Sequence, residues 1–169
     1  MRFSKRQLIL VLLLVCIPAA AAVLSRSSLA DRFRSDGPME LKVNLSERTL
    51  SVIEDGEVVQ TYGVAIGTPS HPTPTGSFRT GTIDWNPRWV PPNSEWARGE
   101  QAREPGDPAN PMQGVKIHFS PLYFIHGTND PESIGSAASH GCLRMRTGDA
   151  TDLARRIEEY GSVPLTIEG

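Results

Sequence analysis

The sequence of 169 residues has few cysteines, almost no net charge and only one long apolar run. Two cysteines, Cys16 and Cys142, are too few for a disulfide scaffold or a four-cysteine zinc site. The formal net charge of −2 does not indicate the basic face that a sequence-independent nucleic-acid binder needs, so we expect no nucleic-acid partner. The one long apolar run lies within residues 8–24.

The composition that is present favours a folded chain with many turns. Hydrophobic residues make up 38% and charged residues 21%, which is enough apolar material for one buried core. Glycine and proline together account for 29 residues, a content that favours turns over a long helical bundle.

The N-terminal segment has the features of an export signal. Residues 1–7 contain three basic residues and no acid, residues 8–17 are apolar, and a run of alanines follows Pro18. This order predicts a secretory signal peptide over residues 1–24. The alternative is an uncleaved membrane anchor, since 17 apolar residues form a helix of about 26 Å, close to a bilayer core of ~30 Å.

Export changes the significance of the remaining cysteine. Without residues 1–24 the chain has 14 Lys and Arg against 19 Asp and Glu, a net charge of −5, and Cys142 is its single cysteine. An odd cysteine in an oxidising compartment indicates either intermolecular pairing or a reactive thiol.

Residues 25–38 are polar and are predicted to be a tether, and residues 39–169 to form a mainly β domain. One strong helical pattern, with apolar residues at i, i+4 and i+7, covers Thr147–Tyr160. Alternating or apolar runs predict strands over Glu40–Leu45, Thr49–Ile53, Glu57–Ile66, Phe78–Ile83, Gly114–His118, Tyr123–His126 and Val163–Ile167.

A long irregular segment interrupts the strand pattern at residues 84–112. It contains six of the 14 prolines and all three tryptophans. A loop of this length in a compact domain is usually functional or disordered, and tryptophans argue for packing or ligand contact. We therefore expect this segment to border a binding site.

Residues suited to nucleophilic catalysis are concentrated between His126 and Arg144. A cysteine nucleophile needs a nearby base and backbone N–H donors for the oxyanion. His126 ends an apolar strand, and the N–H groups around Gly141 and Cys142 are candidate oxyanion donors. We expect the nearby imidazoles and Arg144 to lower the pKa of the thiol. No acid is placed by spacing to orient His126, which leaves a backbone carbonyl as its candidate partner.

Two other interpretations of Cys142 compete with a nucleophile. It is an inert buried thiol in one, and a ligand of a zinc site together with His118, His126 and His140 in the other. The His-Gly pair directly before the cysteine disfavours the first. The spacing from His140 to Cys142 is too tight for typical structural zinc hairpins, which disfavours the second.

This pattern resembles the L,D-transpeptidase catalytic domain, or YkuD domain, of bacterial cell-wall enzymes. That family's signature is a histidine, a spacer of about 14 residues, then Ser/Thr-His-Gly-Cys and an Arg or Asn two residues on, and His126, Ser139–Cys142 and Arg144 match it. Further matches follow in the family's order over residues 39–169: Gly67, Thr73–Gly76, Asn86–Pro92, Pro105–Pro111 and Ile125–Asn129.

The resemblance implies a β-sandwich-like fold with one main C-terminal helix, and no metal or cofactor. It implies that Cys142 is the nucleophile and His126 the general base. It also implies a supporting set and a substrate groove, the first comprising Ser139, His140, Gly141, Arg144 and Gly127, and the second Trp85, Trp89, Trp96 and His118.

The implied reaction takes place on peptidoglycan. Cys142 attacks the L,D bond of a tetrapeptide stem, D-Ala leaves, and an amine of another stem or of a wall-attached protein takes the acyl group. Alternatives on the same fold are a hydrolase that uses water and a non-catalytic peptidoglycan-binding domain. The expected location is the periplasm or cell envelope, with the inner membrane as a partner if the N-terminal segment stays attached.

Overall fold

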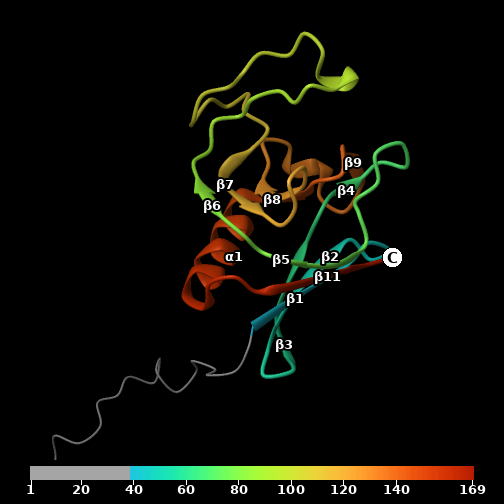
Figure 1. Ribbon diagram of the computed structural model, residues 1–169, viewed down its shortest axis with the longest axis vertical. Helices are drawn as coiled ribbons and strands as arrows, with labels where there is room; N and C mark the ends of the chain where they lie inside the picture. The colour runs from blue at the N-terminus through green and yellow to red at the C-terminus, as the bar shows by residue number, and fades with distance from the viewer. Residues whose placement is uncertain (1–38) are drawn as a thin grey trace, which may run out of the picture. The chain divides into compact units, whose positions relative to one another are not determined.

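The computed structural model describes residues 39–169, and the predicted signal or anchor (residues 1–24) and tether (residues 25–38) lie outside the described residues. Three sheets, one α-helix and two short 3₁₀ helices make up the described part (Figure 1). The predicted mainly β class is confirmed. No helix among residues 39–169 is both long and apolar enough to cross a membrane.

The largest sheet has five strands in the order β3-β2-β1-β11-β5. The predicted meander forms its first three strands, and the Asp55–Gly56 turn has positive φ at both residues, as a tight hairpin requires. β1 pairs in parallel with the C-terminal strand β11, so the first and last strands of the described chain are neighbours, with Glu168 opposite Asn44. The bounds of these strands are β1 Met39–Asn44, β2 Thr49–Glu54, β3 Glu57–Gly63, β5 Gly76–Arg79 and β11 Pro164–Glu168.

A second sheet has four strands in the order β10-β8-β7-β6, and a two-stranded sheet pairs β4 with β9. Neither β9 nor β10 was predicted from the sequence. The bounds are β4 Ile66–Gly67, β6 Ile83–Trp85, β7 Gln113–His118, β8 Phe124–Gly127, β9 Ala137–Ser139 and β10 Leu143–Met145.

The strand predicted over residues 78–83 is divided between the two larger sheets. Buried Thr80 lies at the division, where its N–H donates to the Val163 carbonyl and its hydroxyl accepts from the Val163 N–H. The next N–H, of Gly81, donates to the carbonyl of His118 in the second sheet. The chain therefore changes sheets at these two residues.

Helix α1 covers Thr147–Tyr160, the predicted range, and packs against β7 and β8. Its buried face is formed by Ala150, Leu153, Ala154 and Ile157. Gly161 ends it with φ of 79°, a conformation that favours glycine. The helix thus covers the side of the four-stranded sheet that is turned toward the core (Figure 1).

The register of the four-stranded sheet separates an apolar row from a charged row. Ile83, Ile117, Ile125 and Leu143 pair across the strands, and the last three are completely buried. The neighbouring row consists of Asp84, Lys116, His126 and Arg144. Because successive side chains of a strand point to opposite faces, the charged row projects away from the core.

Gly67, at the end of β4, lies in close contact with the loop that follows it. A Cβ at Gly67 would collide with the backbone of His71 and Thr73, so Gly67→Ala forces the loop that follows β4 to move. We expect a loss of at least ~2 kcal/mol in the free energy of unfolding, measured by urea denaturation.

Gly148→Ala is the matched control, because a Cβ at this helical position meets nothing within 4 Å. It should leave stability unchanged or raise it by up to ~1 kcal/mol. Equal stabilities for the two variants would contradict the close packing of the 67–76 loop.

Candidate active site

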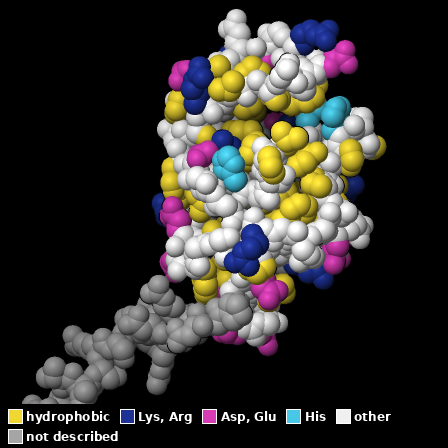
Figure 2. Space-filling view, in the orientation of Figure 1, with side chains coloured by type: hydrophobic (Ala, Val, Ile, Leu, Met, Phe, Trp, Pro, Cys, Tyr) yellow, Lys and Arg dark blue, Asp and Glu magenta, His cyan; other side chains and the backbone are white. Residues whose placement is uncertain are grey.

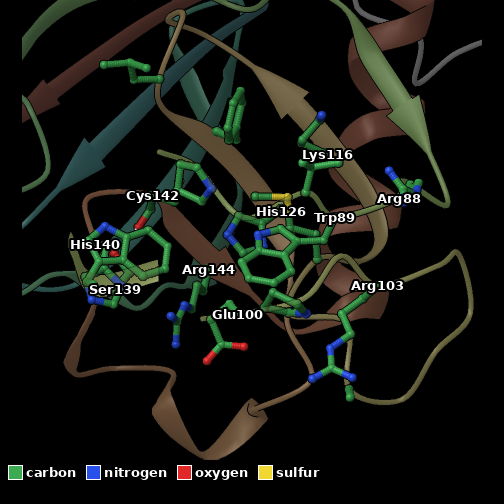
Figure 3. A pocket seen from close by; sticks show the side chains of 18 of the residues that line it. Arg88, Trp89, Glu100, Arg103, Lys116, His126, Ser139, His140, Cys142 and Arg144 are labelled. Carbon is green, nitrogen blue, oxygen red and sulfur yellow. Dashed lines mark hydrogen bonds between the residues drawn. The ribbon is translucent and has the colours of Figure 1, made fainter. Parts of the chain in front are cut away.

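A cavity of about 650 Å³ lies between the four-stranded sheet and residues 88–112, a segment that we call the lid. Figure 2 shows a hollow below the top of the molecule, bordered by hydrophobic side chains, and Figure 3 shows the lining residues from close by. From the lid come Arg88, Trp89, Val90, Pro92, Trp96, Glu100, Arg103, Ala109, Pro111 and Met112, and from the rest of the chain Lys116, Pro121, Leu122, Phe124, His126, Ser139, His140, Cys142 and Arg144.

His126 is held at the inner wall of the cavity in one orientation. Its side chain is 3% exposed, and its Nδ1 lies 2.9 Å from the Gly127 carbonyl oxygen. A carbonyl oxygen only accepts, so Nδ1 carries the proton and Nε2 keeps a free lone pair. Gly127 has no space for a Cβ, which would meet the backbone of Gln113. The expected orienter of His126, a backbone carbonyl, is therefore in place.

The pKa of His126 is lowered to about 4, chiefly by burial, with a smaller contribution from the positive charges of Arg144 and Lys116 and against the opposing effect of the Gly127 hydrogen bond. The imidazole is thus neutral at physiological pH. A neutral imidazole with a free Nε2 is the form that can accept a proton from a neighbouring thiol.

Cys142 is a free, partly buried cysteine in the same cavity. Burial raises the pKa of its thiol, while a backbone hydrogen bond with Phe124 and the charges of Arg144 and Lys116 act in the opposite direction. The expectation that nearby groups lower this pKa is therefore wrong for the net shift, because desolvation of the thiolate outweighs the two cations. The resting thiol is protonated and needs a base.

The hydroxyl of Ser139 shapes the turn that presents Cys142. It accepts a hydrogen bond from the Gly141 N–H at 3.0 Å and donates to the Cys142 carbonyl at 2.6 Å. Gly141 has φ of 107°, and a Cβ there would collide with the Tyr123 ring. Of the two predicted oxyanion donors, the Gly141 N–H is already occupied, whereas the Cys142 N–H has no acceptor among residues 39–169.

Arg144 and Lys116 flank His126 on the two neighbouring strands. Lys116 is paired with Asp84 at 2.8 Å, whereas the Arg144 guanidinium makes no ion pair within the described part of the chain. Lys116 was not predicted as a site residue. Its alternation with buried Val115 and Ile117 was the available signal, since it places Lys116 on the face opposite the core.

Two of the four predicted groove residues line the cavity, and two lie outside it. Trp89 and Trp96 line it. Trp85 pairs with buried Val115, so its side chain lies on the α1 side of the sheet, where Nε1 donates to Glu158 at 2.7 Å. His118 lies at the far end of β7 and contacts Asp84 at 2.9 Å. The groove assignment of Trp85 and His118 is therefore corrected.

His140 belongs to a stack of aromatic rings at the edge of the cavity. Trp96 of the lid lies parallel to its ring, with centroids 3.9 Å apart and planes 7° apart, and the edge of His71 approaches from the other loop at 4.9 Å. Burial, with the charges of His71 and Arg144, lowers the pKa of His140. The sequence held no signal for His71, since its ring is brought to the site only by the 67–76 loop.

The described residues do not support the zinc alternative for Cys142. No group of three or more His, Cys, Asp or Glu within residues 39–169 has the arrangement of a metal site. His118, one of the histidines of the zinc alternative, contacts Asp84, whereas His126 lies opposite Lys116 on β8.

A sequence profile of the L,D-transpeptidase catalytic domain (YkuD) matches residues 38–165. The chain belongs to this family. YkuD of Bacillus licheniformis, which is named as an L,D-transpeptidase, is 33% identical over 130 residues, covering 76% of this chain. The chain spans 66% of the length of that relative.

Solved L,D-transpeptidases share the fold. The structure of one from Mycobacterium smegmatis superposes with a TM-score of 0.60 at 18% identity, over 78% of this chain and 58% of that protein. Another, solved in complex with imipenem, superposes with a TM-score of 0.57 at 19% identity, over 77% of this chain and 58% of that protein. The predicted L,D-transpeptidase fold is confirmed.

The pKa of His126 predicts how this family member responds to acid. Because the folded pKa of about 4 lies below the ordinary value of 6.5, only the unfolded chain takes up a proton as pH falls through this window. Stability should therefore fall between pH 6.5 and pH 4, by about 3 kcal/mol from this group.

NMR titration of the imidazole and urea denaturation across the same range measure the two quantities. The lowered pKa values of Asp84 and Asp152 act below their ordinary value of 3.8, outside this window. The lowered pKa of His140 adds a loss of stability within it, so the NMR titration of each imidazole separates the two contributions. An imidazole that gains its proton near pH 6.5 would contradict the described burial.

Proposed function

We propose that this chain is a peptidoglycan L,D-transpeptidase in which Cys142 is the nucleophile and His126 the general base. The observation that supports this most directly is a free thiol and a buried neutral imidazole that line one cavity, with no partner for the imidazole Nε2 within residues 39–169. Membership of the L,D-transpeptidase family supports the reaction class.

The first step forms a thioester. The Cys142 thiol gives its proton to Nε2 of His126 as sulfur attacks the carbonyl carbon of the L,D bond between the third residue and the terminal D-Ala of a tetrapeptide stem. The bond to the D-Ala nitrogen then breaks, and His126 returns the proton to that nitrogen. D-Ala leaves as the free amino acid.

The negative charge on the carbonyl oxygen is greatest in the tetrahedral intermediate. The Cys142 N–H, which has no acceptor within residues 39–169, is the donor that we assign to stabilise it. Ser139 is a positioning residue in this scheme, because its two hydrogen bonds fix the turn from Ser139 to Cys142. Arg144 adds a positive charge that favours the thiolate.

The second step transfers the acyl group. An amine of another stem attacks the thioester, sulfur departs, and His126 carries the amine proton back to the thiolate. The product is a 3→3 cross-link, or a protein attached to the wall when the amine belongs to a protein. With water as acceptor the same site acts as an L,D-carboxypeptidase or a cross-link hydrolase.

The proposed location is the periplasm or cell envelope, in contact with peptidoglycan stems. The basic and apolar pattern of residues 1–24 supports export, and an uncleaved segment would add an inner-membrane attachment. A role in cell-wall biogenesis and cell shape follows from cross-linking.

A carbapenem tests the reactivity of Cys142, since it presents an acyl group to a nucleophilic thiol. Intact-protein mass should show one adduct, mapping to Cys142, and Cys142→Ala should show none while keeping its circular-dichroism spectrum. Failure of the unmodified protein to form an adduct would contradict the nucleophile and favour a peptidoglycan-binding domain.

Replacement of the base should slow the same reaction. His126→Ala should lower the acylation rate constant by about 10²- to 10⁴-fold, because water must then accept the proton from a thiol with a raised pKa. His118→Ala, which removes an imidazole outside the cavity, should change the rate less than about threefold. An unchanged rate in His126→Ala would transfer the role to His140.

A further inference from the structure

We infer that the lid carries a binding site for an α-amino-acid zwitterion, with Arg103 for the carboxylate and Glu100 for the ammonium group. This inference rests on the proposed function and names the part of the stem that the lid recognises. It follows from the partners that the charged side chains lining the cavity have or lack.

Five Lys, Arg, Asp or Glu side chains line the cavity, and two of them are neutralised by acids of the chain itself. The Arg88 guanidinium contacts Glu104 at 2.7 Å, and the Lys116 ammonium contacts Asp84 at 2.8 Å. Arg144 lies in register with His126 and serves the reacting groups. Glu100 and Arg103 remain, and neither side chain has an ion pair or hydrogen bond within residues 39–169.

The backbone holds both residues in place although their side chains are unengaged. Arg103 exchanges two backbone hydrogen bonds of 2.9 Å with Trp89, whose side chain is buried. Glu100 follows the short helix η2 (Glu95–Ala97), and its N–H donates to the carbonyl of buried Ala97 at 3.1 Å. In the view of Figure 3 the Glu100 carboxylate lies between the guanidinium groups of Arg144 and Arg103.

Arg103 and Glu100 form no ion pair with each other, so a ligand that has both a carboxylate and an ammonium group is complementary to them. A guanidinium binds a carboxylate through two parallel hydrogen bonds, and a carboxylate accepts from an ammonium group. The proposed donor stem has such a pair when its third residue is meso-diaminopimelate, whose side chain ends in an amino and a carboxyl group on one carbon. Lysine lacks the carboxylate, and an amidated diaminopimelate lacks its charge.

The experiment compares D-Ala release from three tetrapeptide donors that differ only in this side chain: diaminopimelate, its side-chain amide and lysine. The unmodified protein should prefer the first over the second by about tenfold in kcat/KM, the effect of one charge-assisted hydrogen-bonded pair at a half-exposed site.

Arg103→Gln should abolish this preference by lowering kcat/KM about tenfold for the diaminopimelate donor alone, mainly through KM. Glu100→Gln should weaken all three donors, since each has the ammonium group. Arg98→Gln is the matched control: Arg98 is a lid arginine outside the cavity, 3.6 Å from Glu95, and its loss should leave the preference unchanged.

The outcomes separate the two proposals. Release of D-Ala with no preference between the acid and the amide, or a preference that survives Arg103→Gln, would overturn the zwitterion site and leave the proposed function intact. An unchanged circular-dichroism spectrum and urea midpoint in Arg103→Gln show that the fold is undisturbed. No release from any donor would overturn the proposed function, and this inference with it.

Discussion

The site depends on the parallel pairing of β8 with β10. In this pairing Arg144 lies opposite His126, and Cys142 directly precedes β10. The two strands are separated by residues 128–142, so residues distant in sequence meet only because the strands are neighbours in one sheet. The Ser139 hydrogen bonds and the Gly141 backbone then turn Cys142 toward the cavity.

Burial decides the charge state of the two central groups. Desolvation disfavours the charged form of each, so it lowers the pKa of His126 and raises that of Cys142. A resting pair of neutral imidazole and protonated thiol is the consequence. Such a pair is less susceptible to oxidation than a free thiolate, and in the proposed mechanism it forms the nucleophile only as the proton moves to His126.

Local patterns in the sequence predicted the meander, the helix and the positions of His126 and Cys142. Period-two alternation and the helical repeat are local signals, and the His-Gly-Cys motif is the local signal that predicts the candidate site. β9 and β10 were missed because strands of three residues have too little periodicity to detect. The separation of Trp85 from Trp89 and Trp96 was missed because it depends on sheet register, as Trp85 pairs with buried Val115. The predicted direction of the net pKa shift of Cys142 was wrong, because the burial that raises this pKa depends on the tertiary structure.

The most direct test of the central claim is product analysis after incubation of the protein with purified tetrapeptide muropeptides. The account predicts free D-Ala together with a dimer joined between the third residues of two stems, and neither product with Cys142→Ala. Tripeptide muropeptides and D-Ala without any dimer would show that water is the acceptor. Unchanged muropeptides would contradict the catalytic assignment.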